Sequence, residues 1–222
     1  MKNIEIKDSF DLFMNQFGIN ESKIIEFGLR ESIFMDAENV TLQWSELKNK
    51  IANNNEVFVR NYGRIKSKQD KLLDFYKTVL NLENVEWDPT NNTEPTKLIS
   101  NILKIKKNRD IFNYKVSHVW GKTINPYSFT AAWNIVYVPT VIDPFTGHES
   151  KGDLCEKYKD AFRKHTYNLF KKEIDDFNSI MTSLSSAVNN YINQIVSIND
   201  VCNQHLNEFK EHLLDSFKPI EL

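Results

Sequence analysis

Helical spacing of apolar residues dominates the first half of the chain. The stretch FDLFMNQF places four apolar residues of 10–17 on one helical stripe, and residues 20–34 repeat the spacing after Asn20, a typical N-cap residue. Residues 68–80 are also amphipathic, and residues 96–107 return to a helical pattern after the turn-rich stretch 87–96. Alternation in 56–66 predicts a strand. We therefore expect residues 1–110 to form an α-rich N-terminal region.

Between residues 111 and 150 the pattern changes to the alternation that is typical of strands. IFNYKVSHV (111–119) places Phe112, Tyr114, Val116 and His118 on one face, and AWNIVYVP (132–139) is a second β-like run. Pro139 ends the second run, because proline cannot donate to a strand ladder. IDPFTGHESKGD (142–153) is typical of a turn that leads into a helix. The order predicted for 111–155 is strand, loop, strand, turn, helix.

Residues 156–222 are expected to form a C-terminal helical arm. Apolar residues recur there at alternating steps of four and three, which is a heptad seam. This seam allows a long helix that pairs with another chain, or a helical hairpin packed on its own domain; we favour a homodimer through the C-terminal helices. SIND (197–200) is a point where the arm can break into two helices. The seam consists of Phe177, Met181, Leu184, Val188, Tyr191, Ile195, Ile198, Cys202, His205 and Phe209.

The predicted fold class is α+β and predominantly α-helical, with a ββα finger inserted between the N-terminal region and the C-terminal arm. Composition supports an ordinary soluble protein: 222 residues, 41% hydrophobic, with a net charge of −2 that creates no overall positive field. Cys155 and Cys202 belong to no CxxC pair, which argues against a disulfide framework and a Cys-ligated zinc site. No run of apolar residues has signal-peptide or membrane-spanning length, so we expect a cytoplasmic protein with no membrane partner.

Three polar residues of the predicted strand–strand–helix unit occur in a distinctive order. His118 ends the first strand, Asn134 opens the second, and His148 precedes the helix. With the pieces SHV, WNIVYVP and GHE, residues 112–155 resemble the HNH endonucleases, the ββα-metal finger group. Each of the three is also a common structural residue when it occurs alone, so the interpretation depends on their occurring together.

The resemblance implies a metal-dependent DNA endonuclease of the restriction or phage-defence type. His118 would be the general base, Asn134 would bind the metal or orient the base, and His148 would complete the metal site or contact the scissile phosphate. A divalent cation, Mg²⁺ or Mn²⁺, would stabilise charge on the leaving oxygen. Ser117 stands where the family usually has an acidic residue or a second histidine that binds the metal. Asp143 or Glu149 is expected to supply the missing carboxylate.

Basic residues near the predicted strand at 56–66 are candidates for contacts with phosphate groups. Tyr62 lies among them, and a second basic stretch directly precedes the finger. His165, His205 and His212 fall on the C-terminal helices, where we interpret them as structural. The basic candidates are Arg60, Arg64, Lys66, Lys68 and Lys71, then Lys104, Lys106, Lys107 and Arg109, and Lys122 in the finger loop.

Other enzyme classes lack their usual motifs. GxxxxGK[ST], GxGxxG after a strand, and GxSxG are absent, and Gly121-Lys122-Thr123 has no upstream glycine at the required spacing. Two alternatives to an endonuclease therefore remain: a non-catalytic nucleic-acid-binding protein with a degenerate finger, which Ser117 favours, and a helical interaction protein that functions through the heptad seam.

Overall fold

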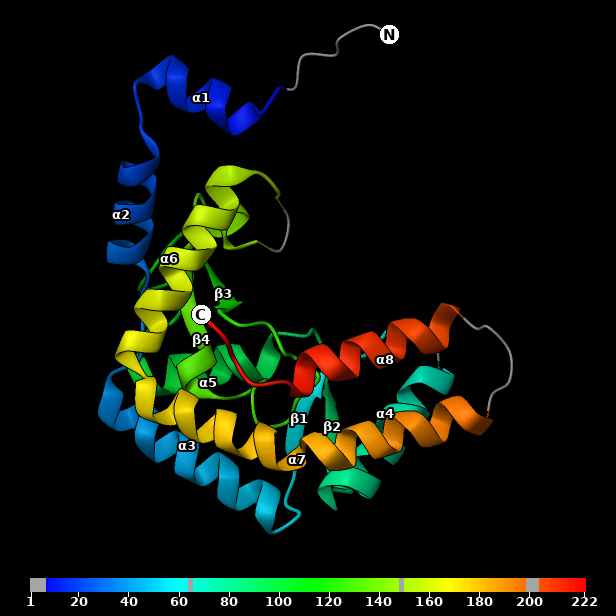
Figure 1. Cartoon of the computed structure of the whole chain (residues 1–222). Coiled ribbons are helices and arrows are strands. Elements are labelled where there is room, and N and C mark those ends of the chain that lie inside the picture. Colours follow the sequence, from blue (N-terminus) through cyan, green and yellow to red (C-terminus); the bar gives the residue numbers. More distant parts are fainter. Residues whose placement is uncertain (1–6, 64–65, 148–149, 199–203) are drawn as a thin grey trace, which may run out of the picture.

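The computed structural model describes residues 7–63, 66–147, 150–198 and 204–222. It confirms a predominantly α-helical α+β fold, in which helices surround two small sheets (Figure 1). The elements are α1 (Ser9–Phe17), α2 (Glu21–Glu31), α3 (Ala37–Ala52), β1 (Val57–Arg60), α4 (Lys66–Leu80), β2 (Val85–Asp88), α5 (Thr93–Leu103), β3 (Tyr114–His118), η1 (Ala132–Asn134), β4 (Ile135–Pro139), η2 (Asp143–Thr146), α6 (Asp153–Leu169), α7 (Lys171–Ile198) and α8 (Gln204–Phe217).

Side chains of Asp and Asn residues cap the N-termini of the first three helices. Oδ1 of Asn20 accepts a hydrogen bond from the backbone N–H of Lys23 at 2.9 Å, which confirms the cap expected from the sequence. Asp8 and Asp36 cap α1 and α3 in the same way. Each cap satisfies one of the N–H groups that have no partner within the helix.

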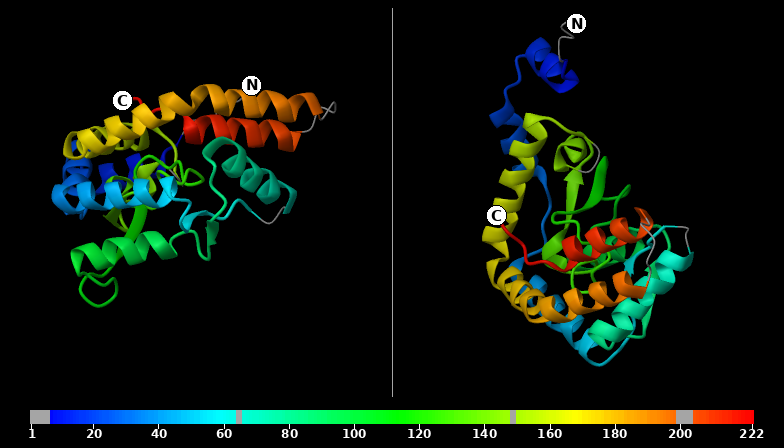
Figure 2. Two further views of the ribbon diagram at one scale, coloured as in Figure 1. Left: turned by 90° about the horizontal axis from the view of Figure 1, so that it is seen from below. Right: turned by 45° about the vertical axis from the view of Figure 1, so that its right-hand side comes forward.

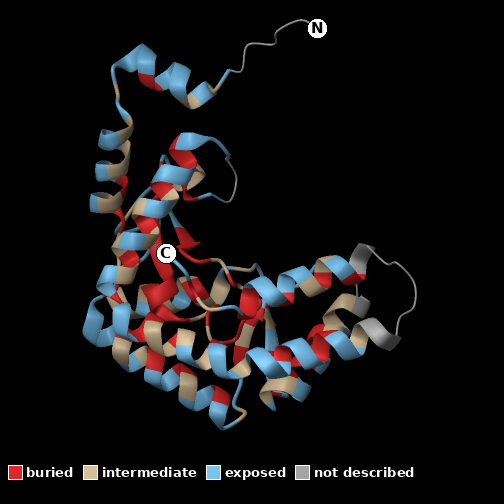
Figure 3. Cartoon of the chain, viewed as in Figure 1, coloured by how far each residue is buried: buried red, intermediate tan, exposed pale blue. Residues whose placement is uncertain are grey.

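Strands β3 and β4 form the antiparallel hairpin that the alternation predicts. Tyr114 pairs with Pro139 and His118 with Ile135, so β4 ends at the proline as expected. All five residues of β4 are buried, and Tyr137 exchanges backbone hydrogen bonds with Ile33 after α2. The order β3, β4, α6 is present. The inserted position of the finger is not confirmed, because β4 lies in the core shared with both flanking regions (Figure 3).

A strand that the sequence did not reveal, β2, begins before the stretch 87–96 and ends within it. β2 pairs in parallel with β1, with Val57 opposite Val85 and Arg60 opposite Asp88. Asp88 is fully buried, and its carboxylate accepts hydrogen bonds from backbone N–H groups at the start of α5, including that of Glu94 at 2.7 Å. One carboxylate thus ends the strand and begins the helix that follows.

The three C-terminal helices pack on the body of their own chain. α8 runs back beside α7, and α4 packs against α7, with Phe75 of α4 in ring contact with Tyr191 of α7 and Phe217 of α8 (Figure 2). The seam residues Phe177, Met181, Val188, Tyr191 and Phe209 are buried there. The hairpin alternative is therefore correct for the described part of the arm. The chain's own core covers these seam residues, so the structure gives no support for pairing with a second copy through them, and the homodimer stays a prediction.

Described seam residues extend along α7 and α8, whereas Cys202 and the side chains of Ile198 and His205 lie outside the described residues. In the part of the chain that the structure describes, every helix is too short or too polar to cross a membrane.

Candidate functional site

His118 lies at the end of β3 and is buried, with 7% of its surface exposed. Its Nε2 lies 2.9 Å from the backbone carbonyl oxygen of Phe129, and its ring stacks on the Phe129 ring at a centroid distance of 5.3 Å. A carbonyl oxygen can only accept, so Nε2 carries the hydrogen in this contact. In this arrangement Nε2 has no lone pair with which to act as a general base.

Asn134 is completely buried beneath the loop between the two strands. Its Oδ1 accepts a hydrogen bond from the backbone N–H of Trp120 at 2.9 Å. Its Nδ2 donates to Ser128 Oγ at 2.8 Å and to the backbone carbonyl of Gly121 at 3.1 Å. These contacts hold the loop 119–131 against β4. Both ends of the amide are engaged in structural hydrogen bonds.

The carboxylate expected for the metal site is engaged in an ion pair. Asp143 begins η2, and its Oδ2 lies 2.6 Å from Nζ of Lys115 on β3. His148 and Glu149 lie outside the described residues. Within the described ranges, no three His, Cys, Asp or Glu side chains lie close enough together to hold a metal ion. The described residues of the finger therefore do not fit the divalent cation that the resemblance implies.

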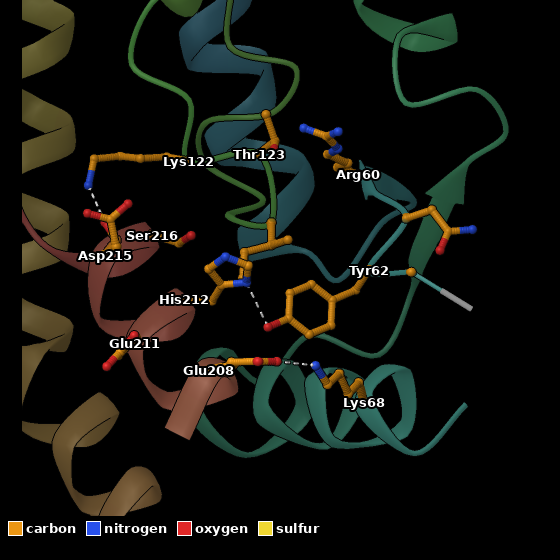
Figure 4. A pocket seen from close by; sticks show the side chains of 13 residues that line it. Arg60, Tyr62, Lys68, Lys122, Thr123, Glu208, Glu211, His212, Asp215 and Ser216 are labelled. Atoms are coloured by element: carbon orange, nitrogen blue, oxygen red, sulfur yellow. Dashed lines mark hydrogen bonds and ion pairs between the residues drawn. The ribbon is translucent and has the colours of Figure 1, made fainter. Parts of the chain in front are cut away.

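Three of the basic residues singled out in the sequence line one cleft of about 640 Å³, namely Arg60, Lys68 and Lys122. β1 and the segment after it carry Arg60 and Tyr62, and the backbone N–H of Arg60 donates to the carbonyl of Thr123 at 2.9 Å, which joins β1 to the finger loop. Arg64 and the side chain of Lys66 lie outside the described residues. The opposite wall is formed by α8 (Figure 4).

A tyrosine and a histidine meet across the cleft. Tyr62 Oη lies 2.9 Å from Nδ1 of His212 on α8, and the two rings meet edge to face at 5.6 Å. Burial, with a smaller contribution from the charge of Glu208, raises the pKa of Tyr62 to about 12. The phenol therefore keeps its proton at neutral pH. His212 is exposed, so its ring is accessible from solvent.

Charged groups of both signs surround this pair. Nζ of Lys68 lies 2.9 Å from a carboxylate oxygen of Glu208, and Glu211 and Asp215 continue the acidic wall along α8. Burial alone would raise the pKa of Asp215, but its hydrogen bond with Lys218 and nearby positive groups, including His212, bring that pKa below its usual value. The cleft is thus basic and aromatic on one side and acidic on the other.

Lys122 lines the cleft near the end of α8 (Figure 4). Its buried ammonium donates to the backbone carbonyls of Asp215 at 2.6 Å and Lys218 at 2.8 Å, where α8 ends. A cation at a helix C-terminus is favourable, because the helix dipole places negative charge there. Burial nevertheless lowers the pKa of Lys122 to about 8. Lys122 therefore anchors α8 more than it presents a charge to a ligand.

A family model and a relative of similar length both match this chain. A family model described as uncharacterised protein PM1201 matches residues 35–222. Uncharacterized protein PM1201 of Pasteurella multocida (strain Pm70) is 38% identical over 216 residues, which cover 97% of this chain and 98% of the relative. This chain belongs to the PM1201 family. No solved structure matches it. Both walls of the cleft fall within the part that the PM1201 family model covers.

The sequence pointed to functional residues on only one wall of this cleft. Arg60, Lys68 and Lys122 were candidates for nucleic-acid contacts, but His212 was interpreted as a structural position on the arm. Tyr62 and His212 are 150 residues apart, so no local spacing could connect them. One signal in the sequence could have connected the two residues. It was the alternative of a helical hairpin for the arm, because a hairpin brings α8 back against the body of the chain.

Proposed function

We propose that this protein binds single-stranded nucleic acid in the cleft between β1 and α8. The observation that carries the proposal is the convergence of Arg60 and Lys68 with Tyr62 in one cleft, whose α8 wall is anchored by Lys122. Proteins that bind single strands combine basic side chains that follow the backbone with aromatic rings near the bases. This cleft contains both kinds of group.

Arg60 supports a phosphate contact most directly. It is exposed at the end of β1, and among the described residues no hydrogen bond or ion pair engages its guanidinium. Its planar fork can bind two phosphate oxygens at once. Lys68 is held by Glu208 on α8, and a phosphate would have to compete with that half-buried carboxylate for the ammonium.

The acidic wall favours a single strand over a duplex. A duplex carries phosphates on its whole outer surface, and Glu208, Glu211 and Asp215 would repel one of its backbones. A single strand can turn its phosphates to Arg60 and its bases to α8, where carboxylates accept hydrogen bonds from exocyclic amino groups. The volume of about 640 Å³ also lies in the range of pockets that enclose small ligands.

Fluorescence anisotropy with labelled oligonucleotides tests the proposal. We expect single-stranded RNA or DNA to bind more tightly than a duplex of the same length. Arg60→Ala should weaken binding and reduce the slope of log K against log salt by about 0.7, the contribution of one phosphate contact on a single strand. Lys107→Ala, an exposed basic residue of the second stretch, is the matched control and should change neither value. Equal binding by wild type and Arg60→Ala would refute this site.

A second candidate function is the metal-dependent hydrolysis of DNA that the HNH resemblance implies. The observation that favours it is the order β3, β4, α6, which is that of a ββα unit. It would require His118 to leave the carbonyl of Phe129, and a homodimer would need a surface other than the buried seam.

Plasmid DNA incubated with the protein and Mg²⁺ or Mn²⁺ tests the second candidate. It predicts nicking that is lost in His118→Ala while the circular dichroism spectrum of the variant stays native. An intact plasmid with both metals would remove this candidate and leave the binding proposal standing.

A further inference from the structure

We infer that Tyr62 and His212 make the cleft a site of RNA cleavage that requires no metal ion. The inference rests on the proposed binding of single strands and adds an activity and a substrate class to it. The pair is the feature of the cleft that binding alone leaves unexplained. An exposed imidazole is held by a phenol in the same cleft as an uncommitted guanidinium.

We assign to His212 the tautomer that carries its hydrogen on Nδ1, so that Nε2 is the nitrogen that can react. Nδ1 of His212 faces Tyr62 Oη, and Nε2 lies on the other side of the ring, away from the phenol (Figure 4). A phenolic oxygen can accept the hydrogen of Nδ1 while keeping its own proton. Nε2 then presents a lone pair, which is the form of imidazole that removes a proton from a hydroxyl group.

The surrounding charges suit both states of such a base. Glu208, Glu211 and Asp215 lie along the α8 wall, and His212 is the smallest of the contributions, after Lys218 and Lys122, that lower the pKa of Asp215. These carboxylates share the α8 wall with the imidazole that takes the proton. Arg60 supplies positive charge for the phosphate, on which negative charge increases in the transition state.

The reaction that these groups support is an internal transfer within the RNA chain. The ribose 2′-hydroxyl gives its proton to Nε2 of His212 while O2′ forms a bond to phosphorus. The bond between phosphorus and O5′ breaks, and O5′ takes a proton from water in the cleft. The products are a 2′,3′-cyclic phosphate and a 5′-hydroxyl end, and the imidazolium returns its proton to solvent. DNA lacks the nucleophile and would be bound without cleavage.

The test uses the full chain and a labelled single-stranded RNA in EDTA, next to the same oligonucleotide with a single 2′-deoxy residue. Binding is measured by anisotropy and cleavage by gel electrophoresis, and the terminal groups are identified by mass spectrometry. We expect cleavage with a cyclic phosphate end, blocked at the deoxy position. His212→Gln should lower the rate by about 100-fold or more. His165→Gln, which removes an imidazole on α6 outside the cleft, is the control and should retain the rate.

Tyr62 is a positioning residue in this scheme. Tyr62→Phe keeps the ring, so the affinity for RNA should stay within about twofold, while kcat falls and its pH dependence shifts because Nδ1 has lost its partner. RNA that is bound but stays intact would overturn the inference and leave the proposed function. Cleavage that needs Mg²⁺, or that persists in His212→Gln, would also overturn it. No binding at all would overturn the proposed function itself.

Discussion

At the scale of single residues, His118 and Asn134 organise the long connection between β3 and β4. One is hydrogen-bonded to Phe129 and the other to Trp120, Gly121 and Ser128, so both fix the loop that carries Lys122 to the cleft. A buried polar side chain is stable only when its partners are present. The two residues are therefore connected to the cleft through this loop.

Replacing Asn134 with alanine should destabilise the whole protein. The backbone N–H of Trp120 and the groups of Ser128 and Gly121 would lose a buried partner, and each such loss costs about 1–3 kcal/mol. We expect the free energy of unfolding, measured with urea, to fall by roughly 3 kcal/mol. Asn207→Ala on the exposed face of α8 should change it by less than about 0.5 kcal/mol. A native stability for Asn134→Ala would contradict the structural role.

At the scale of elements, a close approach of α2 and α6 depends on one glycine. Gly28 of α2 faces the ring of Tyr158 on α6, and a Cβ at position 28 would lie 2.8 Å from Cζ of that ring. Real Cβ atoms essentially never lie so close to another heavy atom. The two helices can therefore pack at this distance only while residue 28 has no side chain.

Gly28→Ala is expected to destabilise the fold although alanine is the better helix former. The gain in helix propensity is about 1 kcal/mol, whereas overpacking against a buried ring costs about 1–3 kcal/mol. Thermal unfolding should show a lower midpoint than that of the wild type. Glu26→Ala, on the exposed face of the same helix, serves as the comparison and should leave the midpoint almost unchanged. A higher midpoint for Gly28→Ala would show that α2 and α6 are further apart.

The contact between the finger loop and α8 should respond to pH through Lys122. Its pKa is about 8 in the folded protein and near 10.5 in the unfolded chain. Between these values the unfolded state binds more protons than the folded one, so this group makes stability rise with pH. The free energy of unfolding should be measured with urea at pH 7.5, 8.5 and 9.5. With increasing pH it should rise less, or fall more steeply, for Lys122→Met than for the wild type. If the free energy of unfolding depended on pH in the same way for both proteins, the lowered pKa of Lys122 would be contradicted.

At the scale of the whole molecule, local sequence patterns predicted individual helices and strands, but they did not predict the contacts between segments that are distant in the sequence. The hairpin followed from alternation and Pro139, and α2 from Asn20. A heptad seam is the same whether its partner is α4 of the same chain or a second copy, so the seam alone could not choose. β2 is only four residues long and pairs with β1 across an intervening helix. The cleft is harder still to predict from the sequence, because its two walls come together through the folding back of α8.

The most direct test of the account locates a bound strand on the protein. A single-stranded RNA that contains 4-thiouridine would be cross-linked to the protein by light, and the attached peptides identified by mass spectrometry. We predict cross-links in the segment 60–63 and in α8 near His212, and their loss when unlabelled RNA competes. Cross-links confined to the finger around 143–147, or to the basic stretch 104–109, would contradict a cleft between β1 and α8 as the binding site.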